Sequence, residues 1–222
     1  MPGTLVIVTG TTGSGKTTTC IEFVARREDL WLHFGVDIFL SKLVPRKFID
    51  GGPRSADGVH MVPDDANVPD GPAHLQLGRY GAGMIHTMHA MAAAALDAGQ
   101  NLIMDHITTM NPPLLKDCVE VLGDYPVLFV ALRPPLELLG ERIDARLPQI
   151  IEQLGVEHAK RVNEGTRRVS TYMAREIFAH DCFDLVLDTG ALKPPQVADA
   201  ISARLEEGPG RAFATLAQRL CS

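Results

Sequence analysis

The feature that most constrains this chain is a glycine-rich loop between an apolar run and a segment with helical periodicity. The apolar run is Leu5-Val6-Ile7-Val8, which has no polar alternation and suits a strand buried on both faces. The loop follows the pattern GxxxxGK[ST] and consists of Gly10, Thr11, Thr12, Gly13, Ser14, Gly15, Lys16 and Thr17. A strand, this loop and a helix over 17–27, in that order, predict a P-loop that holds the phosphates of ATP or GTP.

The residue types in this loop suit phosphate binding. Glycines let the backbone curl so that its N–H groups point at an anion, and the following helix adds the positive end of its dipole. Lys16 would place a cation near the β- and γ-phosphates, Thr17 would offer a hydroxyl to Mg²⁺, and Thr18 completes the predicted nucleotide-binding set. A guanine-specific GTPase usually carries Asn-Lys-x-Asp after a late strand. The sequence has no such element, which favours ATP over GTP.

Apolar runs alternate with helical segments from end to end, and this alternation predicts an α/β fold. We expect the three layers of a P-loop NTPase or kinase, with a parallel five-stranded sheet and a helical lid. The predicted strands are 5–8, 31–36, 102–104, 127–132 and 183–187. The predicted helices are 17–27, 38–44, 77–98, 112–122, 135–146 (followed by a polar helical stretch to about 163), 167–179, 196–206 and 211–220, with Gly165 as a break. Residues 45–75 are rich in Gly, Pro and Asp and predict a long loop that could contain a short hairpin around 59–62.

Length and composition limit the classes of protein. A chain of 222 residues fits a single domain, 1–222, with a lid excursion at about 133–180. The formal net charge of −6 disfavours nucleic acid or an anionic membrane as partner. Four widely spaced cysteines without a CxxC pair indicate reduced thiols and a cytoplasmic protein. The first apolar run is short and ends in the glycine loop, so we expect neither a signal peptide nor a membrane span, and a homo-oligomer is left open.

Two carboxylates follow predicted strands, where ligands of open α/β sheets bind. Asp37 ends the second strand and Asp105 ends the third. Either could hold Mg²⁺ through water or accept the proton of a substrate hydroxyl. We predict Asp37 as the base, because the apolar run before it would desolvate it, and Asp105 with Thr17 as the metal residues. The alternative for both is a helix N-cap.

Arginines gather after the fourth strand, in the predicted lid. A lid arginine can stabilise the charge that spreads over a phosphoryl group in transfer, and we predict Arg142 in this catalytic role, with Arg133 and Arg142 on the nucleotide. The alternative is a solvated helix pair with acidic partners. The arginines of this region are Arg133, Arg142, Arg146, Arg161, Arg167 and Arg168. Among the histidines, His106 follows Asp105 and is a secondary candidate, while His86 and His89 share a helix face without an evident third metal ligand.

Several of these stretches together resemble the chloramphenicol phosphotransferase family of small P-loop kinases. They are residues 10–17, the stretch Trp31-Leu32-His33-Phe34-Gly35-Val36-Asp37, the strand 102–105, Glu141-Arg142 after 130–133, and 184–189. The resemblance runs in order over about residues 4–190. It implies ATP as phosphoryl donor, a small-molecule hydroxyl as acceptor and Asp37 as the base. It also implies phosphate and Mg²⁺ roles for Lys16 and Thr17.

The acceptor stays open at this point. An antibiotic such as chloramphenicol is the first candidate, and residues 45–75 lie where it would bind. A metabolite or nucleotide kinase of the same fold is the second, with Arg46, Lys47 and Arg54 available for an acceptor phosphate. The third is a nucleotide-gated binding module without acceptor chemistry, against which the position of Asp37 argues.

Overall fold

A parallel five-stranded sheet forms the centre of the computed structural model, which describes residues 1–68 and 71–221. The strand order is β2-β5-β1-β6-β7, and every neighbouring pair is parallel. The sheet strands are β1 (Leu5–Thr9), β2 (Trp31–Gly35), β5 (Asn101–His106), β6 (Val127–Leu132) and β7 (Leu185–Leu187). The predicted α/β class and five-stranded parallel sheet are therefore confirmed.

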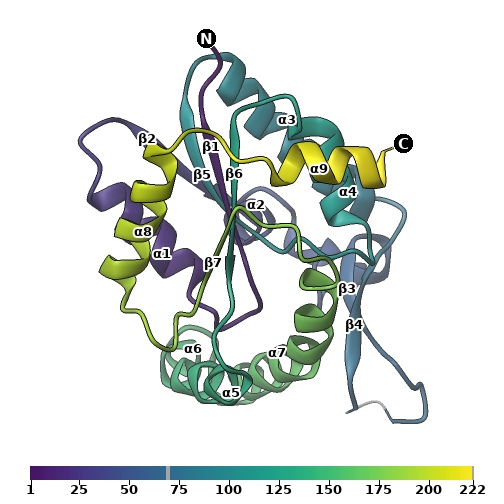
Figure 1. The fold of residues 1–222 in the computed structure, drawn as a ribbon. Coiled ribbons are helices and arrows are strands. Elements are labelled where there is room, and N and C mark those ends of the chain that lie inside the picture. The colour runs from purple at the N-terminus through teal and green to yellow at the C-terminus, as the bar shows by residue number, and fades with distance from the viewer. Residues whose placement is uncertain (69–70, 222) are drawn as a thin grey trace.

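Helices cover both faces of this sheet (Figure 1). One face packs against α3 (Gly81–Asp97), α4 (Leu114–Leu122) and α9 (Ala212–Leu220). The other packs against α1 (Lys16–Ala25) and α8 (Pro194–Glu206). Alternate residues of β1 point to opposite faces, so the apolar run 5–8 feeds both cores, as a doubly covered strand requires.

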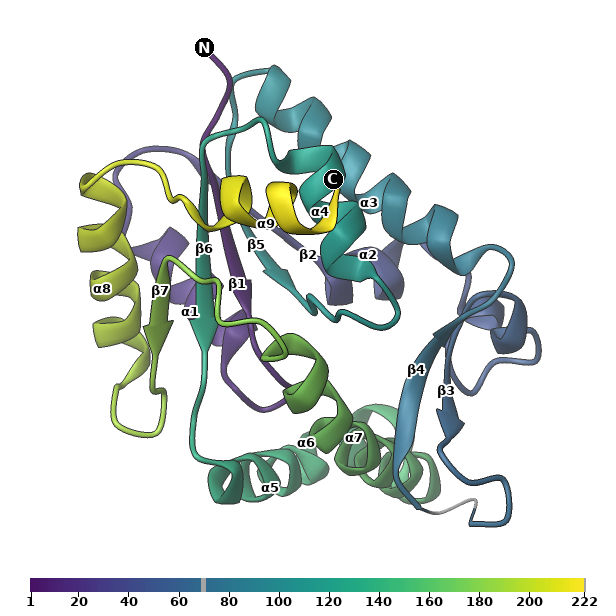
Figure 2. The same cartoon turned by 45° about the vertical axis from the view of Figure 1, so that its right-hand side comes forward.

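Three further helices form the lid beyond the carboxyl ends of the strands (Figure 2). They are α5 (Leu136–Ala145), α6 (Leu147–Leu154) and α7 (Val156–Ile177). The expected break at Gly165 is wrong, because α7 runs through it. Gly165 is buried there, and a Cβ would lie 3.2 Å from Cε of Met61, so the glycine makes room for a neighbouring segment.

That neighbouring segment is an antiparallel hairpin, which confirms and extends the hairpin expected around 59–62. It pairs β3 (Val59–Pro63) with β4 (Ala73–Leu77), and residues 69–70 of the predicted loop lie outside the described residues. Before it come α2 (Val36–Lys42) and two short 3-10 turns, η1 (Arg46–Phe48) and η2 (Ser55–Asp57).

The predicted helix over 77–98 starts too early. Leu77 ends β4 opposite Val59, and α3 begins only at Gly81. Gly78 explains the boundary: its N–H donates to the Gly58 carbonyl at 2.7 Å, and a Cβ at this position would lie 2.0 Å from the Ala56 carbonyl oxygen. The chain therefore turns tightly at residue 78 before the helix begins.

Candidate active site

The glycine loop joins β1 to α1, and its backbone takes the shape that its sequence requires. Gly10, Gly13 and Gly15 have φ values of 152°, 85° and 95°, a region that favours glycine. At Gly10 a Cβ would also lie 2.6 Å from Oγ of Ser14, whereas at Gly15 it would meet nothing within 4 Å. Gly15 is thus needed for its backbone angle, and Gly10 for space as well.

Lys16 begins α1 and is held against this loop. Its Nζ donates hydrogen bonds to the carbonyls of Gly10 at 2.8 Å and Thr11 at 3.0 Å, and the residue is only 8% exposed. Burial lowers the pKa of the ammonium, while Asp37 and Asp105 act in the opposite direction. The loop lysine and both predicted carboxylates therefore lie close enough together for their charges to interact.

Asp105 faces the start of α1 from β5. Oγ1 of Thr17 donates to Oδ2 of Asp105 at 2.8 Å, and Nε2 of His33 lies 3.5 Å from the same oxygen. The other oxygen, Oδ1, is buried and has no hydrogen-bond partner among the described residues. A buried, unpaired carboxylate oxygen beside a threonine hydroxyl suits a hard cation such as Mg²⁺, which takes oxygen ligands and keeps several waters. These two predicted metal residues are thus in contact, and they fit the ion.

Asp37 lies in the first turn of α2, just past the end of β2, which stops at Gly35. Its surface is open to solvent, yet dense protein on its other sides desolvates the carboxylate and raises its pKa. Lys16 opposes this rise, and Asp105 adds to it. Asp37 is therefore a carboxylate that water reaches from one side and protein surrounds on the others.

The helix-cap alternative fits neither aspartate. Asp105 lies inside β5, and the N-cap position of α2 is occupied by Gly35. A negative charge in the first turn still interacts favourably with the helix dipole, so Asp37 retains that smaller structural role.

A cavity of about 590 Å³ opens beside the P-loop and reaches under the lid. Its size falls in the range of small-molecule sites. The lining comes from the P-loop, the ends of α1 and α5, and the loop between β7 and α8. The lining residues are Gly13, Ser14, Gly15, Thr18, Thr19, Arg142, Ala145, Arg146, Gln149, 189–194 and Val197. Predicted nucleotide residues from distant parts of the sequence therefore meet at one cavity.

Arg142 is the lid arginine that contacts the P-loop. Its guanidinium donates to Oγ1 of Thr189 at 2.9 Å, to the Thr189 carbonyl at 2.6 Å and to the Gly13 carbonyl at 3.4 Å. Oγ1 of Thr189 in turn donates to the Ser14 carbonyl at 2.8 Å. The guanidinium is thereby fixed at the rim of the cavity. Arg146, one turn later, lies close enough to affect the pKa values of Lys16 and Asp37.

The remaining predicted arginines lie elsewhere. Arg133 stacks on the Phe178 ring with 4.8 Å from its Cζ to the ring centroid, and it does not line the cavity. Arg167 pairs with Asp144 on the exposed side of the lid. Arg168 donates from Nε to the Gly71 carbonyl at 2.7 Å and so joins the lid to the hairpin.

Sequence reasoning missed Thr189 as a site residue, although the signal was present. Thr189 follows β7, and the rule that ligands gather past the carboxyl ends of strands applies to it as it does to Asp37. Thr11 and Thr12 belong to the predicted nucleotide-binding loop, and the structure adds their surroundings. Oγ1 of Thr11 is buried without a hydrogen-bond partner in the described part of the chain, and Oγ1 of Thr12 donates to Sδ of Met173 in the lid at 3.6 Å.

The P-loop, the parallel sheet and the lid define the fold of the P-loop kinases, and solved structures agree. The Mycobacterium tuberculosis APS kinase CysC in complex with AMPPNP and APS matches with a TM-score of 0.57 and 15% identity, covering 92% of this chain and 98% of that one. A Janibacter sugar kinase matches at 0.54 and 16%, covering 92% and 95%. A tunicamycin resistance protein from Deinococcus radiodurans matches at 0.51 and 17%, covering 91% and 95%. At these identities the likeness shows the fold.

The family is shown by the sequence itself. The family model for chloramphenicol phosphotransferase-like protein matches residues 3–206, so the chain belongs to this family. No curated protein matches the sequence. Fold and family together support a phosphotransferase. Within residues 1–68 and 71–221, no helix has both the length and the apolar character needed to cross a membrane.

Proposed function

We propose that this protein transfers the γ-phosphoryl group of ATP to a hydroxyl of a small molecule, with Asp37 as the general base. One observation carries the proposal: Asp37 is exposed just past the end of β2, its pKa is raised by burial among neighbouring groups, and it lies close enough to the P-loop lysine for each to shift the pKa of the other. A carboxylate that is partly desolvated is a stronger proton acceptor than one in water.

The step needs few participants. The acceptor oxygen forms a bond to the γ-phosphorus, the bond from that phosphorus to the β–γ bridging oxygen breaks, and ADP leaves. Asp37 takes the proton of the acceptor hydroxyl. We assign to Lys16 and Arg142, which both donate to P-loop carbonyls, the positive charge that would stabilise the phosphoryl group in transfer. Thr17 and Asp105 would hold Mg²⁺, which neutralises phosphate charge when bound.

The local contacts of residues 45–60 support an acceptor without a phosphate group. Arg54 pairs with Asp57 at 2.8 Å, Arg46 donates to the Asp50 carbonyl at 2.6 Å, and Lys47 lies over the Phe48 ring. These basic groups of the predicted acceptor segment are thus engaged with their own neighbours. We therefore favour hydroxylated antibiotics, chloramphenicol among them, over phosphorylated metabolites as acceptors, which would make the protein a resistance enzyme.

The cysteines support a reducing compartment. Cys20, Cys118, Cys182 and Cys221 are all free thiols, and the first two are buried. Burial raises the pKa of the Cys20 thiol, which keeps it protonated and unreactive. We propose the cytoplasm as the place of action, where ATP is also available.

The test combines an acceptor screen with one substitution. ATP consumption is measured against a panel of hydroxylated antibiotics, sugars and nucleosides, first with the wild type and then with Asp37→Asn. Loss of a general base should lower turnover by ~10²–10⁴-fold. The ATP dissociation constant should change little, because a base that faces the acceptor does not carry the phosphate contacts. Asp29→Asn is the matched control, since Asp29 precedes β2 at the opposite end of that strand.

Two results would contradict the proposal. If Asp37→Asn turns over acceptor at the wild-type rate and binds ATP as the wild type does, Asp37 is not the general base. Slow ATP hydrolysis by the wild type that no hydroxylated compound accelerates would instead favour the nucleotide-gated binding module.

A further inference from the structure

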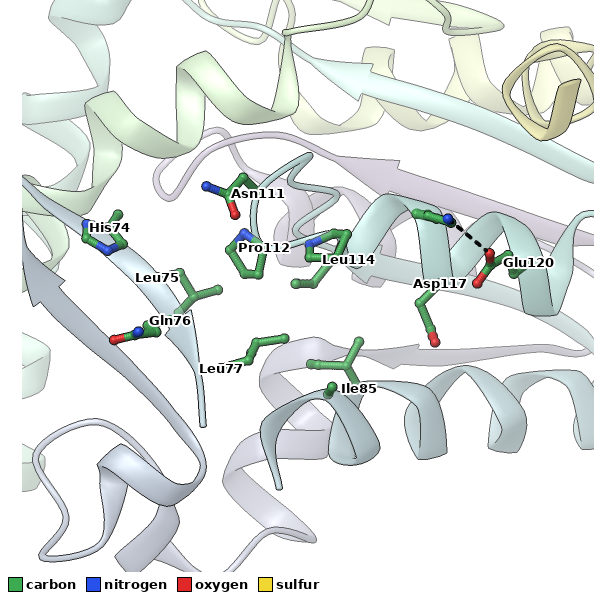
Figure 3. Close-up of a pocket in the computed structure, with 13 residues that line it drawn as sticks. His74, Leu75, Gln76, Leu77, Ile85, Asn111, Pro112, Leu114, Asp117 and Glu120 are labelled. Carbon is green, nitrogen blue, oxygen red and sulfur yellow. Dashed lines mark ion pairs between the residues drawn. The ribbon is translucent and has the colours of Figure 1, made fainter. Parts of the chain in front are cut away.

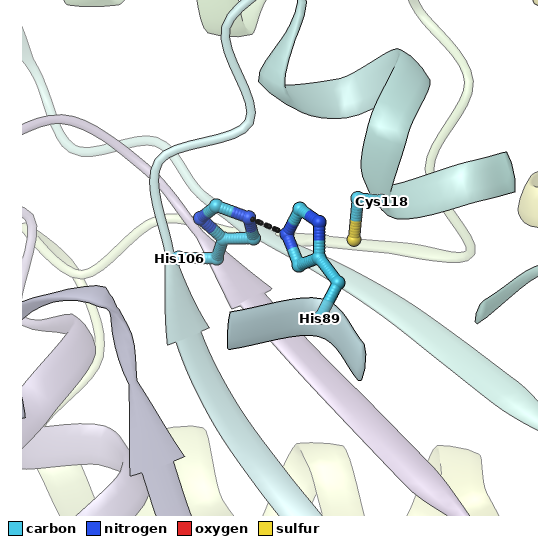
Figure 4. A group of neighbouring side chains, drawn as sticks. All are labelled: His89, His106 and Cys118. Atoms are coloured by element: carbon cyan, nitrogen blue, oxygen red, sulfur yellow. Dashed lines mark hydrogen bonds between the residues drawn. The ribbon is translucent and has the colours of Figure 1, made fainter. Parts of the chain in front are cut away.

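Two histidines are fully buried on the face of the sheet that lies opposite the P-loop helix. His89 comes from α3 and His106 ends β5, and both are 0% exposed. Figure 4 shows their rings facing each other, with Cys118 of α4 beside them. Buried polar groups are costly unless they are hydrogen-bonded, so the partners of both rings decide what this pair does.

A continuous chain of hydrogen bonds connects the two rings. The backbone N–H of Ile107 donates to Nδ1 of His106 at 2.7 Å, Nε2 of His106 lies 2.7 Å from Nε2 of His89, and Nδ1 of His89 lies 2.5 Å from Oδ2 of Asp117. A neutral imidazole has one N–H and one lone pair. Since Nδ1 of His106 accepts, its Nε2 carries the proton and donates to His89, whose Nδ1–H then donates to Asp117. This single arrangement of protons gives both rings and the Asp117 carboxylate a hydrogen-bond partner.

The same residues could be read as a metal site, because the ligand atoms of His89, His106 and Cys118 lie within 4.8 Å of one another. Two features favour hydrogen bonding. Nitrogens that share a tetrahedral zinc at ~2.0–2.1 Å would be about 3.3 Å apart, which is wider than the 2.7 Å between the rings. The lone pair of His106 Nδ1 is also taken by Ile107, so its Nε2 carries a proton and cannot bind a metal.

The outer end of the chain reaches a surface cavity. Asp117 lines a hollow of about 610 Å³ between β4, α3 and α4, shown in Figure 3. Oδ1 of Asp117 also contacts Nδ1 of His86 at 2.9 Å, and the His86 side chain is 60% exposed. The carboxylate is thus partly hydrated, whereas both rings behind it are dry.

The inner end of the chain reaches the active site through strand alternation. Successive strand residues point to opposite faces, so His106 points toward α3 and α4 while Asp105 points toward α1, where it accepts from Thr17. Past His106, Oγ1 of Thr108 lies 2.8 Å from Oγ1 of Thr9, the residue that immediately precedes the P-loop. Holding His106 in place therefore also restrains Asp105 before it and Thr108 after it.

We propose that Asp117, His89 and His106 form a positioning network that holds the end of β5, and thereby sets Asp105 against Thr17. The inference rests on the proposed function, because it assigns to Asp105 the Mg²⁺ role. His89 and His106 are fully buried, so the network acts on the site through Asp105. A buried network in which every polar group has a hydrogen-bond partner specifies one arrangement of its side chains, whereas a network with unpaired groups does not.

The first test replaces His89 with methionine, which keeps much of the volume but neither hydrogen bond. Misplacing catalytic groups by about 1 Å can cost ~10²-fold in rate, so kcat should fall by roughly 10- to 100-fold. The Mg²⁺ concentration that gives half of the Mg²⁺-dependent AMPPNP binding should rise. AMPPNP affinity without Mg²⁺ should not change, because the P-loop is untouched. His86→Gln is the matched control: it contacts the same carboxylate from outside the chain and should behave as wild type.

A double mutant separates positioning from general damage. If the network acts through Asp105, adding His89→Met to Asp105→Asn should cost nothing further, since groups that act as a unit are non-additive. Additive losses would overturn the proposal, as would a His89→Met protein with wild-type kcat and wild-type Mg²⁺ dependence.

The wild-type protein tests the proton arrangement directly. Ring ¹⁵N resonances should show His106 protonated at Nε2 alone and His89 at Nδ1 alone. The reverse tautomers, or one equivalent of zinc that the purified protein retains, would overturn the network. These spectra and the Mg²⁺-dependent binding need no acceptor. A wild type that phosphorylates no compound would therefore contradict the proposed function alone.

Discussion

Replacing Gly35 by alanine should disable the site through one contact. Gly35 ends β2 and pairs with Asp105 of β5 in the sheet. Its φ of 175° and ψ of 173° are extended backbone, which alanine also adopts, so the conformation itself does not require glycine. A Cβ at this position would, however, lie 1.6 Å from Oδ1 of Asp105 and 2.6 Å from its carbonyl oxygen. The Asp105 side chain thus lies in the space that the glycine leaves.

The size of the displacement gives the size of the effect. An ordinary contact begins at 3.4 Å, so Oδ1 has to move by about 2 Å or the two strands have to separate. Either change breaks the 2.8 Å hydrogen bond between Asp105 and Thr17. We expect kcat to fall by at least ~10²-fold, and the free energy of unfolding to fall by about 1–3 kcal/mol from overpacking.

Phosphoryl transfer and thermal unfolding are measured on the same preparations. The control is Gly83→Ala in α3, where a Cβ would meet nothing within 4 Å. That substitution should leave activity unchanged and stabilise the helix by up to ~1 kcal/mol. In an Asp105→Ala background the clash with Oδ1 is removed, and Gly35→Ala should then cost less. A Gly35→Ala enzyme with wild-type kcat and melting temperature would refute this reasoning.

Four further predictions concern Lys16, Arg142 and Asp37. Lys16→Ala should leave a folded protein with little transferase activity, and near-normal turnover of the acceptor would contradict the P-loop assignment. Arg142→Lys should weaken ATP binding and turnover because lysine cannot reproduce the planar fork that holds Thr189, whereas Arg167→Lys, at an exposed pair, should behave as wild type. Because burial raises the pKa of Asp37, the acidic limb of kcat/KM should lie above pH ~4, where an ordinary aspartate titrates, and a limb at or below that value would contradict the raised pKa. The same shift means that the wild type loses stability as pH rises through the folded pKa of Asp37, because the carboxylate then ionises in the folded protein. The melting temperature of Asp37→Asn, measured relative to wild type, should therefore be higher at pH 8 than at pH 4.

The parts of the site that the sequence predicted are those fixed by local chemistry. The P-loop needs glycines at particular backbone angles and a lysine at a set spacing, and both requirements are visible in residues 10–17. Asp37 and Asp105 could be proposed as site residues because buried strands are recognisable in the sequence, and the carboxyl ends of parallel strands meet at one edge of the sheet. The helix-cap alternative for these residues could be set aside only once the bounds of β5 and α2 were known.

The parts that the sequence could not predict depend on contacts between distant elements. Glycine usually weakens a helix, and a break at Gly165 followed from that rule; tertiary packing against Met61 overrides it. His86 and His89 were visible as neighbours on one helix face. Their shared partner Asp117 comes from α4, and no local spacing connects it to them.

Different lid helices pack beside the proposed acceptor site and the proposed nucleotide site. Val169 and Ile177 of α7 are buried against the hairpin, and Arg168 is hydrogen-bonded to it, so α7 and the hairpin pack as one unit on the side where we place the acceptor. The nucleotide cavity is lined instead by α5 and α6, through Arg142 and its neighbours. Oγ1 of Thr12 in the P-loop donates to Sδ of Met173 in α7, which connects this unit to the P-loop. A substitution in the hairpin should therefore affect acceptor binding first, and it should affect nucleotide binding only through α7.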